Sequence, residues 1–80
     1  IPSRIYVANI HDLVQEDEIN AIFSAFGPVR HCHLAPANAE RNAHRGYAYV
    51  EFESEDAAHA AIDALDNFEL AQRLLKVGPT

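Results

Sequence analysis

The stretch Arg45–Phe52 reads R-G-Y-A-Y-V-E-F, with alternate residues of different character. In an extended strand, successive side chains point to opposite faces of the sheet. Tyr47 and Tyr49 therefore share one face, and Val50 and Phe52 share the face that builds the core. An aromatic ring outside the core leaves a large apolar area in water. Two such rings, preceded by an arginine and a glycine, predict a platform on which a flat group stacks.

A second stretch, Ile5–Ile10, reads I-Y-V-A-N-I and also predicts a strand. Its alternation turns Ile5 and Val7 toward the core and leaves Tyr6 on the opposite face, together with Arg4. All three tyrosines of the chain are then expected outside the core.

These two stretches resemble the paired signature motifs of the RNA-recognition motif (RRM) family. Residues 45–52 fit the pattern (K/R)-G-(F/Y)-(G/A)-(F/Y)-(V/I)-x-(F/Y) at every position. Residues 5–10 are similar to the family's (I/L/V)-(F/Y)-(I/V)-x-N-(L/I). The resemblance covers essentially the whole chain. Shorter matches are I-Y-V-A, A-F-G, C-x-L-A, G-Y-A-Y, F-E-L and L-K-V-G. They resemble tandem-RRM splicing factors of the nucleus, which implies binding of pyrimidine-rich single strands.

The remaining sequence predicts two helices. The first begins after an N-cap at Gln15 and ends at Gly27-Pro28. Its apolar stripe at i, i+3, i+4 and i+7 consists of Ile19, Ile22, Phe23 and Phe26. The second helix is expected over Glu53–Asn67, with Ser54 as the N-cap and Asn67 in the left-handed C-terminal position. Its buried stripe consists of Ala58, Ala61, Ile62 and Leu65.

Two further strands are expected at Val29–Leu34 and Leu74–Val77, with a loop at Ala35–His44 and a plain connection at Phe68–Arg73. The predicted fold class is α+β, a ferredoxin-like βαββαβ sandwich. Its four-stranded antiparallel sheet carries both helices on one face. The expected open face carries Tyr6, Tyr47, Tyr49, His31, His33, Arg45, Lys76 and Arg4.

An open face of this kind suits single-stranded nucleic acid, whose unpaired bases stack on aromatic rings. The resemblance implies that Tyr6 and Tyr49 stack successive bases, that Tyr47 packs against sugars and that Arg45 pairs with a phosphate. Lys76 and Arg4 add positive charge, and His31 and His33 offer hydrogen bonds to base edges. Asn9, at the end of its strand, is expected to bond backbone groups of the turn.

The formal net charge of −6 argues against nucleic acid at first sight, because phosphate contacts supply much of the affinity. Most acids, however, fall on the predicted helices, away from the tyrosines. A possible partner face is formed by Glu16, Asp17, Glu18 and Asp63. Three alternatives to RNA binding stay open: a protein-interaction RRM that uses this acidic face, a sheet face covered by another domain, and single-stranded DNA binding.

Composition limits the remaining classes. One cysteine allows no intrachain disulfide, and no apolar run approaches the roughly 18 residues of a membrane span. The sequence His31-Cys32-His33 is rejected as a metal site because the cysteine should point away from both histidines. No nucleophile–base or paired-carboxylate arrangement converges on the open face. The expectation is a binding module without cofactor, metal or enzymatic activity. Residues 1–80 are expected to form one RRM domain, excised from a longer tandem-RRM protein with adjacent RRM domains.

Overall fold

The computed structural model describes residues 2–35 and 46–80 of the chain. Its elements, in chain order, are β1 (Arg4–Ile10), α1 (Glu16–Ser24), β2 (Val29–Ala35), β3 (Gly46–Phe52), α2 (Glu55–Leu65), β4 (Glu69–Leu70), β5 (Arg73–Leu74) and β6 (Lys76–Pro79). Neither helix is long and apolar enough to span a membrane.

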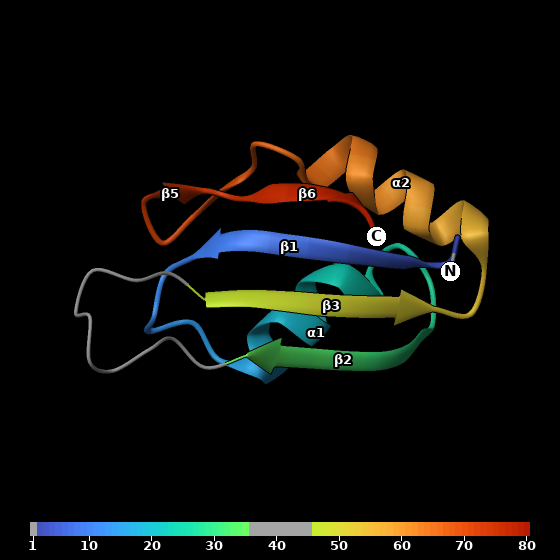
Figure 1. Ribbon diagram of the computed structural model, residues 1–80, viewed down its shortest axis with the longest axis horizontal. Coiled ribbons are helices and arrows are strands. Elements are labelled where there is room, and N and C mark those ends of the chain that lie inside the picture. The colour runs from blue at the N-terminus through green and yellow to red at the C-terminus, as the bar shows by residue number, and fades with distance from the viewer. Residues whose placement is uncertain (1, 36–45) are drawn as a thin grey trace.

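Four strands form one antiparallel sheet in the order β2-β3-β1-β6. Both helices pack against one face of this sheet. Figure 1 looks onto the other face, and α1 is visible behind β2 and β3. The ferredoxin-like βαββαβ architecture predicted from the sequence is therefore confirmed.

The core lies between the sheet and the helices, because alternate residues of each inner strand point toward α1 and α2. The side chains with no exposed surface are Ile5, Val7, Ile19, Phe23, Ala48, Val50, Phe52, Ala58, Ala61 and Leu75. The predicted alternation of β1 and β3 is confirmed. The small alanines of α2 allow the helix to approach the sheet closely.

α1 begins at the predicted N-cap, Gln15. Glutamine is a weak cap, but the Glu18 carboxylate accepts the Gln15 backbone N–H at 2.8 Å and so satisfies a donor at the helix start. The helix ends at Ser24, earlier than predicted, because the Phe26 and Gly27 N–H groups bond carbonyls three residues back. Phe26 lies beyond the helix yet still packs against the core.

Gly27 joins α1 to β2 where no other residue fits well. Its φ of +154° is a conformation that side chains rarely adopt. A Cβ atom at this position would lie 2.8 Å from the Ala57 Cβ. The close approach of this turn to the first turn of α2 therefore depends on glycine.

α2 spans Glu55–Leu65 and is shorter at both ends than the predicted Glu53–Asn67, but Ser54 and Asn67 take their predicted capping roles. The Ser54 hydroxyl accepts the Ala57 N–H at 3.1 Å. Asn67 takes the left-handed conformation, with a φ of 67°. Beside it, the Asp66 carboxylate accepts the Val77 N–H at 3.1 Å and ties the helix end to β6.

The prediction of a plain connection at Phe68–Arg73 is wrong. This segment contains β4 and the start of β5, which form a separate two-stranded hairpin. Ala71 and Gln72 form the turn, with φ values of 53° and 68°. A two-residue hairpin turn of type I′ requires a positive φ at both of its central residues. The last strand of the main sheet consequently begins at Lys76, not at Leu74.

Candidate nucleic-acid interface

The open face of the sheet is a grid of side chains set by the strand register. One row runs across all four strands: His33 lies opposite Tyr49, Tyr49 opposite Tyr6, and Tyr6 opposite Gly78. Directly opposed residues have Cβ atoms about 5 Å apart. The structure therefore places the two rings predicted to stack bases, and one histidine, side by side on the face to which alternation assigned them.

The three tyrosine rings are accessible, with exposed fractions of 39% for Tyr6, 47% for Tyr47 and 40% for Tyr49. Tyr47 and Tyr49 make an edge-to-face contact, with ring centroids 5.9 Å apart and planes at 87°. A Cβ atom on Gly78 would lie 3.6 Å from Cε1 of Tyr6, so this ring lies over the glycine of the neighbouring strand. The rings are thus held by neighbours while one surface of each stays in solvent.

The next row brings together His31, Glu51 and Arg4, since both basic residues lie opposite Glu51. Glu51 therefore brings a negative charge to the open face. Its carboxylate lies 3.5 Å from the guanidinium of Arg30. Sequence reasoning missed this pair, because Arg30 sits at the register irregularity between Val29 and His31. The pairing offsets the negative charge where a polyanion would approach.

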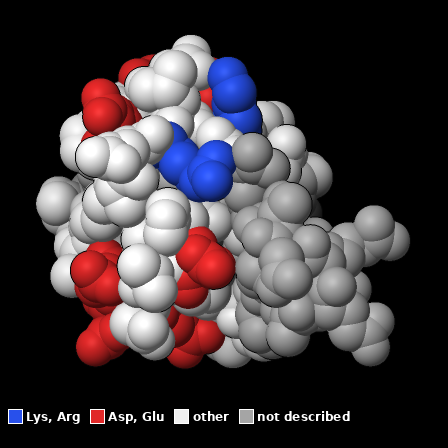
Figure 2. Space-filling model, turned by 90° about the vertical axis from the view of Figure 1, so that its left-hand side faces the viewer, with Lys and Arg blue, Asp and Glu red and all other residues white. Residues whose placement is uncertain are grey.

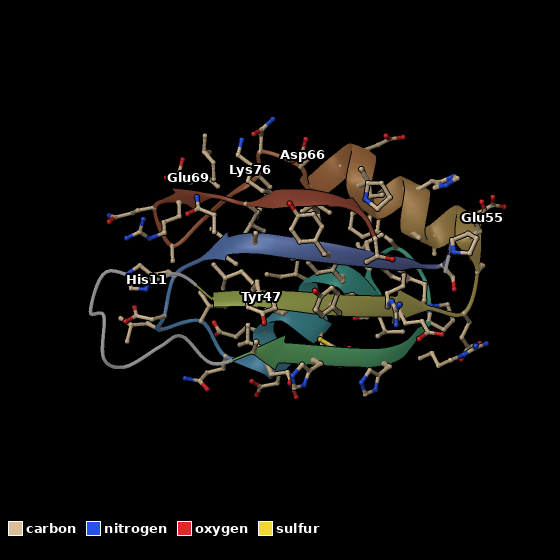
Figure 3. All side chains as sticks on the ribbon, viewed as in Figure 1. His11, Tyr47, Glu55, Asp66, Glu69 and Lys76 are labelled. Carbon is tan, nitrogen blue, oxygen red and sulfur yellow. The ribbon has the colours of Figure 1, made fainter. Side chains whose placement is uncertain are left out.

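Lys76 lies at the β6 edge of the face, opposite Ala8 of β1 (Figure 3). Its ammonium donates to the Asn67 side-chain oxygen at 2.8 Å, so the C-terminal end of α2 positions it. Asn9 bonds backbone as predicted, but its side chain donates to the Leu74 carbonyl of β5 at 2.7 Å and not to the adjoining turn. Arg45, the predicted phosphate partner, lies outside the described residues, as does most of the Ala35–His44 loop.

A depression of about 450 Å³ opens beside Tyr49. It is lined by Arg4, His31, His33, Tyr49 and Thr80. Nε of Arg4 is buried without a hydrogen-bond partner among the described residues. Three basic side chains from two strands therefore border the same hollow, a grouping that strand periodicity alone did not reveal.

The acids of the predicted partner face are exposed, but two of them already bond the backbone. The Glu16 carboxylate accepts the Leu34 N–H of β2 at 2.8 Å, and Glu18 caps the start of α1. Asp17 lies next to Glu16 in the first turn of α1, and Asp63 lies on the other helix. The structure thus gives Glu16 and Glu18 structural roles that the sequence did not indicate.

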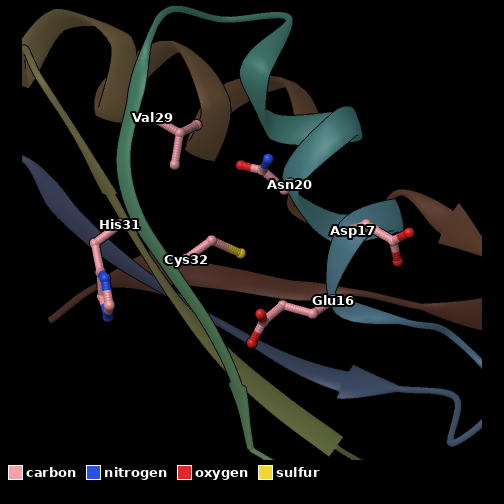
Figure 4. Close-up of a pocket in the computed structure, with 6 residues that line it drawn as sticks. All are labelled: Glu16, Asp17, Asn20, Val29, His31 and Cys32. Atoms are coloured by element: carbon pink, nitrogen blue, oxygen red, sulfur yellow. The ribbon is translucent and has the colours of Figure 1, made fainter.

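Glu16 and Asp17 also border a second depression, of about 270 Å³, between α1 and the outer strand β2. Figure 4 shows the Cys32 side chain facing α1, whereas His31 lies on the other side of β2. Both residues border this depression, but their side chains point to opposite sides of β2. Burial, and secondarily the nearby Glu16 carboxylate, raises the pKa of the Cys32 thiol above its usual 9.0.

Charged side chains of both signs lie at the end of the molecule that carries the β4–β5 hairpin. Figure 2 views this end and shows the Lys and Arg atoms in the upper half, with Asp and Glu atoms beside them and below.

Comparison of the chain with known proteins shows the family to which it belongs. The profile of the RNA recognition motif matches residues 5–76. The chain belongs to the RNA recognition motif family. This RRM is 40% identical over 76 residues to the poly(U)-binding-splicing factor hfp of Drosophila melanogaster, a match covering 95% of the chain and 12% of hfp. It is 42% identical over 73 residues to the putative RNA-binding protein RbpE of a Nostoc species, covering 91% of the chain and 73% of RbpE.

Among solved structures, this RRM superposes on the Rna15 RRM with bound RNA (GU) at a TM-score of 0.84. That match has 26% identity and covers 98% of this chain and 82% of the other. The chain spans about an eighth of the length of hfp. The likeness thus concerns one domain of that splicing factor.

Proposed function

We propose that this RRM binds single-stranded RNA, preferentially pyrimidine-rich RNA, on the open face of its sheet. The observation that carries the proposal is the placement of three exposed tyrosines on the face opposite the helices. Each base stacked on an aromatic side chain contributes about 1–3 kcal/mol. The pyrimidine preference is supported by the poly(U)-binding name of hfp, and RNA binding by the RNA held in the Rna15 structure.

Each residue of the sheet face takes a role that follows from its position. Tyr6 and Tyr49, adjacent in one row, stack two bases, and Tyr47 packs against sugars at the edge of Tyr49. Arg45, which precedes β3, pairs with a phosphate, and Lys76 adds charge at the β6 edge. The domain serves as a binding module without catalytic activity.

The cellular role follows from the relatives. We infer that residues 1–80 are one RRM of a longer nuclear protein that acts in pre-mRNA splicing with adjacent RRM domains. The splicing-factor name of hfp supports this role. Few cations face the strand, so an isolated domain binds weakly and gains affinity from neighbouring RRMs on the same chain.

Titration of the ¹⁵N-labelled domain with a short oligo-U tests the proposal. Backbone shifts are expected in Tyr6, His31–His33, Gly46–Glu51 and Lys76, with the helices unchanged. The double variant Tyr6→Ala/Tyr49→Ala should lose about 2–6 kcal/mol of binding free energy, because two stacking surfaces disappear. The matched control Tyr6→Phe/Tyr49→Phe keeps both rings and should bind within about 1 kcal/mol of the wild type.

Two results would redirect the assignment. An oligo-dT that binds as tightly as oligo-U would make the domain a general single-strand binder. Shifts absent from the sheet face at millimolar RNA would rule out RNA binding by this domain alone. The acidic helical face would then be tested with a basic peptide, through Asp17 and Asp63, the two acids of that face without a structural hydrogen bond among the described residues.

A further inference from the structure

We propose that the depression beside Tyr49 is a phosphate subsite, and that it holds a bound strand more tightly when His31 and His33 are protonated. The inference rests on the proposed function, because the phosphate belongs to a strand lying on the sheet face. It adds a chemical role for the two histidines and a dependence of affinity on pH.

The position of the depression favours a phosphate over a base. It adjoins the ring of Tyr49, so the backbone of a nucleotide stacked there would pass beside it. Besides Tyr49, its lining consists of one guanidinium, two imidazoles and one hydroxyl. The Thr80 hydroxyl already donates to the Arg4 carbonyl at 3.3 Å, so the N–H groups of the guanidinium and the imidazoles are the donors that match the oxygens of a phosphate.

Arg4 supplies the permanent charge of the subsite. Its position opposite Glu51 in the register sets the side chain on the open face. Nε of Arg4 is buried and finds no acceptor within the described part of the chain. Arg4 itself lines the depression, so its positive charge would attract a phosphate oxygen that enters there.

His31 and His33 supply the variable charge. Both side chains are exposed, and histidine changes charge between about pH 8 and pH 5. The acid nearest to them on the open face is Glu51, which lies opposite His31 and is paired with Arg30. Once protonated, the two histidines would therefore present two positive charges to an incoming phosphate, and the sheet would add little negative charge to oppose them.

The other charged and titratable side chains near the two histidines come from the neighbouring strands and from α1. Arg4 approaches from β1, and Tyr49 lies opposite His33 on β3. From α1, Glu16 and Asp17 border the second depression together with His31, but Figure 4 shows these acids on the far side of β2 from the His31 ring. They therefore lie outside the phosphate subsite.

The experiment measures the Kd of fluorescently labelled oligo-U by anisotropy from pH 8.0 to pH 5.5 at constant ionic strength. Uracil does not titrate in this range, so a change in Kd reports on the protein. The Kd should fall roughly tenfold on acidification, the factor that two exposed ion pairs would give together. The double variant His31→Gln/His33→Gln should show a flat profile. The control His59→Gln, which alters an exposed histidine on α2 paired with Glu55, should keep the wild-type slope.

A second arm distinguishes phosphate contacts from base contacts without any protein variant. Oligo-U molecules carrying one uncharged methylphosphonate linkage are compared, with the linkage moved along the strand. One linkage position should abolish most of the response to pH. A response that survives every single replacement would assign the histidines to base edges and overturn the phosphate subsite.

The remaining outcomes separate the two proposals. RNA bound with the same Kd at every pH overturns the subsite and leaves RNA binding by the sheet face intact. A pH response that persists in the double histidine variant also overturns it. Failure to bind oligo-U at any pH overturns the proposed function and the subsite together.

Discussion

At the residue scale, Gly27 shows how one position can constrain two elements. Its φ of +154° excludes most side chains, and the space for a Cβ is taken by Ala57 of α2. A strained backbone conformation costs about 1–3 kcal/mol, and overlap in a packed interior adds to this cost. The Gly27-Pro28 pair was recognised in the sequence as a helix stop, but the contact with α2 was not predictable from it.

We therefore expect Gly27→Ala to lower the free energy of unfolding by about 2–4 kcal/mol, as measured by urea denaturation. Gly46→Ala is the matched control. Its new Cβ would meet the Ala35 carbonyl oxygen at 3.5 Å, an ordinary contact, so stability should change by less than about 1 kcal/mol. The double variant Gly27→Ala/Ala57→Gly should recover part of the loss, because the steric overlap is removed while the backbone strain remains. A Gly27→Ala protein as stable as the wild type would contradict this account.

At the scale of elements, Glu16 connects α1 to the outer strand of the sheet. Its carboxylate accepts the Leu34 N–H at 2.8 Å, and within the described part of the chain β2 is the outermost strand on that side. The side chain therefore satisfies a donor of the strand edge and also complements the positive end of the helix dipole.

Glu16→Ala should lower the free energy of unfolding by about 1–2 kcal/mol, since both the hydrogen bond and the dipole interaction disappear. Asp17→Ala provides the control. Asp17 occupies the same turn without a hydrogen bond among the described residues, so its loss should cost only about 0.3–1 kcal/mol. Thermal unfolding followed by circular dichroism measures both values. Equal losses in the two variants would show that the Leu34 hydrogen bond contributes nothing.

The elements also show where sequence reasoning succeeds and where it stops. Period-two alternation located β1 and β3, and cap residues such as Ser54 located the helices to within a few positions. The β4–β5 hairpin was missed because its strands have two residues each and its turn uses Ala71 and Gln72. Neither residue type is a usual signal for positive φ. Local sequence carries little information when tertiary contacts stabilise an unfavourable turn.

Some features of the candidate site could also be predicted from the sequence, and others could not. Alternation was sufficient to place Tyr6, Tyr47 and Tyr49 on one face. The face to which a side chain points depends only on which residues form the strand. The Arg30–Glu51 pair and the grouping of Arg4 with the histidines depend on register and on an irregularity in β2. Register is set by the assembled sheet, so these features required the structure.

At the scale of the whole molecule, the net charge of −6 does not describe the surface that meets a ligand. The first turns of both helices are acidic, and the one described acid of the inner strands that faces outward, Glu51, is paired with Arg30. The basic residues left to contact a phosphate chain are Arg4, Lys76 and, by the proposed role, Arg45. Binding should therefore depend more on stacking than on charge.

The salt dependence of RNA binding tests this balance. Two or three phosphate contacts give a slope of about −1.5 to −2 for log K against log salt concentration with a single strand. The Kd for oligo-U should be measured between 50 and 300 mM salt at pH 8.0, where the histidines contribute least charge. A slope steeper than about −4 would mean that many more cations reach the strand than this face provides.

The Glu16–Leu34 hydrogen bond has a consequence for encounters between molecules. An exposed strand edge is a template on which a second chain can add its own strand, which is the first step of aggregation. Along β2, one backbone donor that such a strand would need is already bonded to the carboxylate. That carboxylate also places a negative charge at the edge, where it would repel the same charge on an identical copy. Glu16 is therefore expected to hinder self-association of the domain at the high local concentrations found where many copies gather on one RNA.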